Sequence, residues 1–398
     1  METAPNSRLA GLDFLRVVAV LMVLGNHTTI CPPEVSAFLN QVTSVWDRGG
    51  WTGVDLFFVL SGFLISGLLF NEYRQRGDID IKRFLIRRGL RIYPAFWFLL
   101  LITVLVSVLT HETLYRGGYL SELLFLQNYH PSIWGHTWSL AVEEHFYVFL
   151  SALFLLLLFL HRKHSTRAFA SIPALFGVIA VASLLIRYWT ASHAPVSYEH
   201  NIEPSHLRMD SLFFGVFLSY LWNCRGLSAR ESLRRYRYGV GLIGVGCFLP
   251  AFLFGLGETP WLWTLGLTLF YLGGGCLLLA TLKADIKRDS VWGRLANIGK
   301  YSYSIYLWNP MVDGSLNKFT HLAAENWVLY ALLSWTGTFV LGIGTAKLIE
   351  YPVLKLRDKW VGSSIPALRT VPVGLSKGPS HLGAGRPLDA GSQLIPSA

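Results

Sequence analysis

Two ionisable side chains stand inside the first long apolar run of the sequence. Arg16 and His27 are 11 residues apart, about three helical turns, so in a helix they share one face at about 16 Å axial separation. Ionisable groups inside an apolar span are costly and by default indicate function. A buried pair with a purely structural role is the alternative, and we favour the functional interpretation.

Further polar and charged residues are expected near the depth of His27. They are Asp55, Glu143, Glu144, Arg208, Asp210 and Asn309. A carboxylate beside an imidazole orients the ring and raises its basicity, which predicts a general base made of His27 with Glu143 or Glu144. Adjacent helix residues point about 100° apart, so one glutamate is expected to face the site and the other a neighbouring helix. Arg208 is expected to hold a substrate or stabilise an oxyanion; its structural alternative is a pair with Asp210.

A basic cluster lies at the other end of these runs. Arg87, Arg88 and Arg91 precede the third apolar run, and Arg16 is expected to point toward them. Clustered arginines are natural receptors for phosphate groups. The alternative is that they belong to an ordinary basic loop on the cytoplasmic side of a membrane. The residues therefore indicate a phosphate-bearing ligand at one end and acid–base chemistry further along.

Long apolar runs must position these side chains. Runs of about 20 apolar residues predict transmembrane helices, and we expect ten of them, at 9–30, 52–70, 92–110, 138–160, 168–190, 207–223, 238–256, 261–281, 300–317 and 327–349. A shorter stretch, 119–127, is expected to be interfacial or re-entrant. His136, His145 and His161 are also expected to be interfacial. The fold class is therefore all-α, a polytopic transmembrane helix bundle.

The charges in the loops predict the orientation. With the amino terminus placed in the cytoplasm, the cytoplasmic loops carry 22 Lys and Arg residues and the outer loops carry 3. This asymmetry obeys the positive-inside rule. Both termini are therefore predicted to be cytoplasmic, and 361–398, rich in Gly, Pro and Ser, is predicted to be a disordered tail.

The composition excludes several classes of protein. Hydrophobic residues make up 52% of the 398 residues and charged residues only 15%, well below the roughly 25% of soluble domains. The net charge of +10 comes from short loops between apolar runs, so no nucleic-acid partner is expected. The four cysteines are scattered, and no metal site or disulfide framework is predicted.

Seven ordered motifs resemble the acyltransferase family 3 membrane proteins. They are LDFLRVVAVLMVLGNH (12–27), GVDLFFVLSGFLISGLL (53–69), FLIRRGLRIYP (84–94), TWSLAVEEHFYVFL (137–150), LRMDSLFFG (207–215), YSYSIYLWNP (301–310) and Glu350-Tyr-Pro352. The family often has His where this chain has Asn309, which puts an acid–base role there in doubt. The segment 361–398 is too short for the hydrolase-like domain of some members. The resemblance is therefore to the stand-alone form, with an acyltransferase domain at 1–360.

The resemblance implies an O-acyltransferase that uses cytoplasmic acyl-CoA, chiefly acetyl-CoA, as co-substrate. Arg16, Arg88 and Arg91 would bind the CoA phosphates. The acyl group would pass to a hydroxyl of a sugar or glycan at the outer side, either directly or through an acyl-histidine at His27. Membrane lipid is an expected partner, and glycan-assembly proteins are a further one. The expected location is a bacterial inner membrane.

A transporter or glycan-export component is the rival interpretation. Intramembrane charges also serve proton relays. Transporters, however, commonly show paired repeats and broken helices, and the sequence has no such pairing.

Overall fold

The computed structural model describes residues 7–160, 168–226, 228–257, 259–282, 284, 286–287 and 289–362, without the side chains of 7–9 and 228–231. Within these ranges the chain is helical and contains no strand. The predicted tail from 363 lies outside the described residues. Five of the 22 basic residues counted in the cytoplasmic loops also lie outside them, as does His161; the five are Arg162, Lys163, Arg167, Lys283 and Arg288.

A long helix forms at each of the ten predicted spans. These helices are α1 (Ser7–His27), α3 (Gly53–Arg76), α4 (Ile81–Leu109), α6 (Trp138–Leu160), α7 (Ile172–His193), α9 (Met209–Cys224), α10 (Ser228–Leu253), α11 (Leu265–Leu282), α13 (Ser302–Phe319) and α15 (Trp327–Thr345). Within the described residues, eight helical stretches are long and apolar enough to cross a membrane, and α9 and α13 are not among them. The count of ten spans remains a prediction, whereas the all-α, multi-pass class is confirmed.

Short helices connect the long ones. They are α2 (Ala37–Gly50), α5 (Arg116–Leu123), η1 (Gly135–Thr137), α8 (Tyr198–Asn201), η3 (Ser205–Leu207), η4 (Pro260–Trp263), α12 (Val291–Gly299), α14 (Leu322–Glu325), η5 (Ala346–Glu350) and α16 (Tyr351–Trp360). The short helix α5 lies in the region that the sequence marks as too short to cross. Five residues at the end of α15 form a π-helix, η5, which leads directly into α16. Segments of this kind occur frequently at functional sites.

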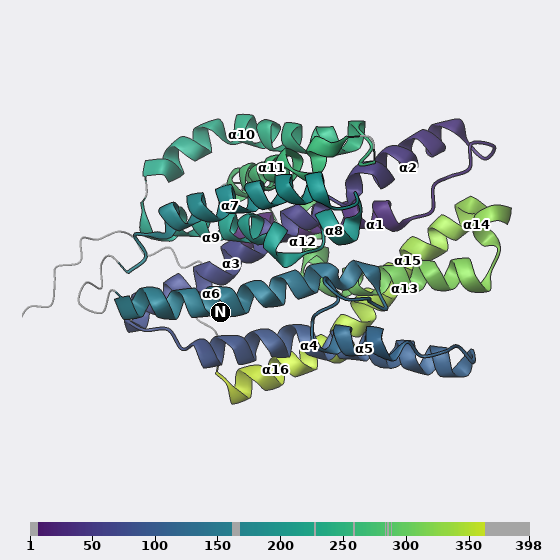
Figure 1. Ribbon diagram of the computed structural model, residues 1–398, viewed down its shortest axis with the longest axis horizontal. Coiled ribbons are helices and arrows are strands. Elements are labelled where there is room, and N and C mark those ends of the chain that lie inside the picture. The colour runs from purple at the N-terminus through teal and green to yellow at the C-terminus, as the bar shows by residue number, and fades with distance from the viewer. Residues whose placement is uncertain are drawn as a thin grey trace, which may run out of the picture. The chain divides into compact units, whose positions relative to one another are not determined.

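Helix α3 is the central element of the described part (Figure 1). It is buried along most of its length and packs against α9, α1 and α11. In Figure 1, α10 and α11 lie to one side of α3, and α4 and α16 lie to the other. Helices α7 and α10 expose most of their apolar residues, as lipid-facing helices do.

Glycines allow α3 and α9 to approach closely. A Cβ atom built on Gly62 would overlap the carbonyl oxygen of Leu212, and one on Gly215 would overlap the carbonyl oxygen of Val59. Small residues at such crossings let helix backbones come together in a membrane, where packing drives association. The close crossing places the amino-terminal ends of α3 and α9, which carry Asp55 and Arg208, side by side.

Candidate active site

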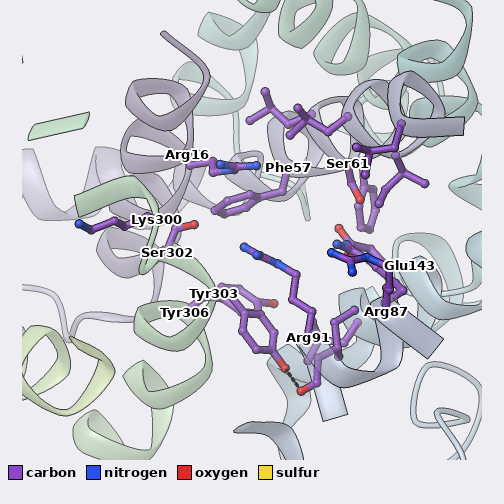
Figure 2. A pocket seen from close by; sticks show the side chains of 18 of the residues that line it. Arg16, Phe57, Ser61, Arg87, Arg91, Glu143, Lys300, Ser302, Tyr303 and Tyr306 are labelled. Atoms are coloured by element: carbon purple, nitrogen blue, oxygen red, sulfur yellow. Dashed lines mark hydrogen bonds and ion pairs between the residues drawn. The ribbon is translucent and has the colours of Figure 1, made fainter. Parts of the chain in front are cut away.

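A cavity of about 540 Å³ runs along α3. Its lining on α3 extends from Val54 to Glu72, a distance of about 27 Å at 1.5 Å per residue. Helices α1, α4, α6 and α13 supply the other walls, with Tyr351 and Arg357 of α16 (Figure 2). The cavity therefore links the carboxyl-terminal end of α3 with its amino-terminal end.

Positive charge dominates the cavity lining. Seven cations line it, Arg16, Arg83, Arg87, Arg88, Arg91, Lys300 and Arg357, against three carboxylates, Asp13, Glu72 and Glu143. Arg83, Arg87 and Arg91 follow one another at intervals of four, so they form one stripe on α4. The helix begins at the N-cap Asp80, whose side chain accepts a hydrogen bond from the backbone N–H of Arg83 at 2.9 Å. Such a lining suits a ligand that carries several negative charges.

The three arginines predicted to bind phosphates all line the cavity, but their partners differ. Arg16 pairs with Asp13, one turn away on α1. Arg88 pairs with Glu143 at 3.3 Å. Arg91 makes no hydrogen bond or ion pair with any residue that the structure describes, and Figure 2 shows its guanidinium pointing into the cavity. Arg91 is therefore the cation most available to a bound anion.

Glu143 is the glutamate that faces the cavity. It accepts a hydrogen bond from the Tyr147 hydroxyl at 2.5 Å, and Arg88 also donates to that hydroxyl and lies 4.4 Å from the centre of the Tyr147 ring. Glu144 does not line the cavity and instead accepts from Tyr93 on α4 at 2.9 Å. Neither glutamate is hydrogen-bonded to His27, so the orientation of His27 by a carboxylate stays a prediction.

His27 lies beyond the other end of the cavity, beside a second histidine. The cavity is lined there by Ser139 and Tyr306, whose hydroxyls are 2.8 Å apart. The ring centre of His136 is 5.4 Å from that of Tyr306 and 6.3 Å from that of His27. His136 is buried, and its expected position at the depth of the membrane interface stays a prediction. Neither imidazole lines the cavity: His136 lies behind the wall residue Tyr306, and His27 lies beside His136.

Asp55, Arg208 and Asp210 do not line the cavity but belong to a buried charge network. Arg208 donates to Asp55 at 2.5 Å, and Arg187 pairs with Asp210. Arg208 and Asp210 therefore have separate partners and do not pair with each other. Among the residues that the structure describes, one carboxylate oxygen of each aspartate and two nitrogens of Arg208 have no hydrogen-bond partner.

Asn309 lies on α13 against α15. Its Nδ2 donates to Thr338 Oγ1 at 3.4 Å, and its Oδ1 has no partner within the described ranges. On the described part of α1 to α16, no three His, Cys, Asp or Glu side chains come together as metal ligands.

Several site residues escaped the sequence analysis although signals existed. Arg187 is a single charge within the predicted span 168–190, which should have marked it. His136 directly precedes the Thr137–Leu150 motif. Tyr306 lies inside the motif 301–310, but nothing in that motif singled it out as a cavity wall, because an aromatic residue in a span is most often packing.

A helical membrane bundle with a cavity lined mainly by cations and with a histidine pair nearby fits an enzyme that handles a negatively charged donor. The chain matches the family model described as an acyltransferase domain over residues 9–346, and it belongs to this acyltransferase family 3. The expectation drawn from the seven motifs is thus confirmed.

Named relatives extend the comparison. The chain is 27% identical to the peptidoglycan O-acetyltransferase OatA of Listeria monocytogenes, over 86% of this chain and 55% of the relative. It is 30% identical to the putative O-acetyltransferase SACOL0978 of Staphylococcus aureus (90% and 60%) and 27% identical to the putative peptidoglycan O-acetyltransferase YrhL of Bacillus subtilis (77% and 49%). The chain thus spans about half to three fifths of the length of these relatives. No solved structure matches it.

Proposed function

We propose that the protein is an integral-membrane O-acyltransferase that moves an acyl group, chiefly acetyl, from acyl-CoA to a hydroxyl of a sugar or glycan. The observation that carries this proposal is a cavity whose lining runs from a cluster of arginines to Tyr306, which lies next to His136 and, beyond it, His27. The family membership supports acyl transfer. The names of the relatives support an O-acetyl product and a glycan acceptor.

The donor enters at the basic end in this proposal. Arg16, Arg88 and Arg91 bind the phosphates of acyl-CoA, because guanidinium groups form charge-assisted hydrogen bonds with phosphate oxygens. The pantetheine arm then extends along α3, where the cavity lining becomes apolar and aromatic. We place the basic end on the cytoplasmic side of a bacterial inner membrane, in keeping with the charge asymmetry of the loops.

His27 is the general base in this proposal. It accepts the proton of the acceptor hydroxyl while the hydroxyl oxygen attacks the thioester carbonyl carbon. The carbon–sulfur bond then breaks, and the departing CoA thiolate takes the proton back from His27. The ester and free CoA are the products, so protons and electrons balance without a metal.

Other predicted residues support these steps. Glu143 holds Arg88 in place through the pair at 3.3 Å. Glu144 lies outside the cavity and holds Tyr93 through their hydrogen bond. We assign Asp55, Arg208, Asp210 and Asn309 to binding of the acceptor, because their unpartnered polar atoms offer hydrogen bonds that sugar hydroxyls can use. Membrane lipid surrounds the bundle, and glycan-assembly proteins are candidate partners.

The test compares ester-linked acyl groups on surface glycans of cells with the gene intact, deleted or replaced by the His27→Ala variant. Mild base releases the groups, and mass spectrometry identifies them. The proposal predicts loss of one ester in both mutants at equal protein levels. An ester that is lost on deletion but persists with His27→Ala would instead favour an export role without catalysis.

A further inference from the structure

His136 is a buried histidine whose environment fixes its protonation. It lies in η1, is 6% exposed, and its Nε2 is 3.3 Å from the carbonyl oxygen of Leu307. A carbonyl oxygen only accepts hydrogen bonds, so Nε2 must carry the proton. In the neutral imidazole the other nitrogen, Nδ1, then has a free lone pair. Nδ1 is buried and has no partner among the described residues.

The loop before α6 holds this imidazole firmly. Glu122 of α5 is fully buried, and its carboxylate accepts the backbone N–H groups of Ile133 and Trp134 at 3.2 and 3.0 Å and the Thr137 hydroxyl at 2.8 Å. Burial raises the pKa of Glu122, and these three hydrogen bonds oppose that rise.

Helix α13 contacts His136 from the other side. The Tyr306 hydroxyl donates to the backbone carbonyl of His136 at 2.5 Å, and Leu307 supplies the carbonyl that bonds Nε2. Two separate elements thus keep Nδ1 in place as a hydrogen-bond acceptor.

The imidazole that neighbours His136 is that of His27. The two rings are T-shaped, with an interplanar angle of 77° and centres 6.3 Å apart. The His27 side chain makes no hydrogen bond within the described part of the chain. A general base needs one nitrogen free for the substrate and the other N–H held by a partner, as the aspartate holds the histidine of a catalytic triad.

We propose that His136 is the positioning residue of His27, with Nδ1 of His136 accepting the N–H of His27 during catalysis. This inference rests on the proposed function. The hydrogen bond fixes the tautomer in which the free lone pair of His27 faces the acceptor hydroxyl. It also stabilises the imidazolium formed when His27 takes the proton. The rings approach when substrate binds, since catalytic hydrogen bonds often tighten only in the Michaelis complex.

Two amide variants separate this role from a structural one. In His136→Asn, the side-chain oxygen can occupy the position of Nδ1 and still accept from His27. In His136→Gln, the amide N–H₂ can reach the position of Nε2 and keep the bond to Leu307. The proposal predicts that the kcat of the His136→Asn variant exceeds that of the His136→Gln variant by about tenfold or more, within the range of general-base effects. The KM for acetyl-CoA should stay within about twofold in both, because the arginines lie at the other end of the cavity.

The experiment uses purified full-length protein in detergent, with acetyl-CoA and a soluble oligosaccharide acceptor. Thermal unfolding is measured for wild type, both amide variants and His27→Ala. A Gln variant as active as the Asn variant or more active would overturn the role of His136, and so would equal losses in both. A His27→Ala variant with wild-type activity would instead overturn the proposed function, whatever the His136 variants do.

Discussion

Arg91 is the residue whose replacement tests donor binding with the least disturbance of the fold. It lines the cavity and has no ion-pair partner among the described residues. Its removal therefore breaks no ion pair of the described residues, whereas removal of Arg88 would leave Glu143 without its cation. The loss of Arg91 also relieves repulsion among the clustered arginines. We expect Arg91→Ala to fold with an unchanged thermal unfolding temperature.

The expected magnitude follows from the charge-assisted hydrogen bond that Arg91 offers. Such bonds contribute about 1.5–3 kcal/mol, and about 1.4 kcal/mol corresponds to a tenfold change in affinity. Loss of Arg91 should therefore weaken CoA binding by about 10- to 150-fold. The remaining six cations of the lining favour the lower end of that range. Arg91→Lys should recover part of the loss, because lysine binds phosphate as a point charge.

Calorimetry with two ligands provides the assay. CoA carries phosphates and pantetheine does not, so Arg91→Ala should weaken the binding of CoA and leave that of pantetheine unchanged. Arg234→Ala is the control, since Arg234 is an exposed arginine of α10 that does not line the cavity. Unchanged CoA affinity, or equal weakening of both ligands, would refute phosphate binding by Arg91.

Three further predictions follow from the packing. Glu143→Gln should lower kcat/KM for acetyl-CoA by about tenfold, the scale of one charge-assisted bond, and Glu144→Gln should change it less; equal effects in steady-state kinetics would contradict this. Arg187→Met should lower the free energy of unfolding by about 3–5 kcal/mol, because it leaves the buried carboxylate of Asp210 unpaired. Adding Asp210→Asn should recover part of that free energy, and thermal unfolding measures both changes. Gly62→Ala should cost about 1–3 kcal/mol through overpacking, while Gly177→Ala, where a Cβ meets no atom within 4 Å, should be neutral; similar melting temperatures would argue against the close helix crossing.

The positions of the helices could be predicted from the sequence. Apolar runs need backbone hydrogen bonds satisfied within the segment, so each long run becomes a helix. Two of these helices, α4 and α10, begin 11 and 10 residues before the predicted spans 92–110 and 238–256. The stripe of arginines on α4 was also predictable, because a spacing of four places residues on one helix face. These features depend only on local pattern.

The partners of the charged residues could not be predicted in the same way. Arg208 pairs with Asp55, 153 positions away, because the glycines of α3 and α9 let those helices cross closely. His136 lies beside His27 because a loop anchored by Glu122 folds back over the end of α1. Such pairings depend on which helices pack against each other. The local spacing of residues in one sequence does not show which helices do so.

The central claim is acyl transfer from CoA with His27 as base. The most direct measurement reconstitutes the protein in liposomes, supplies isotope-labelled acetyl-CoA and an oligosaccharide acceptor, and detects labelled acetyl ester by mass spectrometry. The account predicts labelled ester with wild type and none with His27→Ala, although that variant still binds CoA. Equal ester formation by both proteins, or none by the wild type with CoA bound, would contradict it.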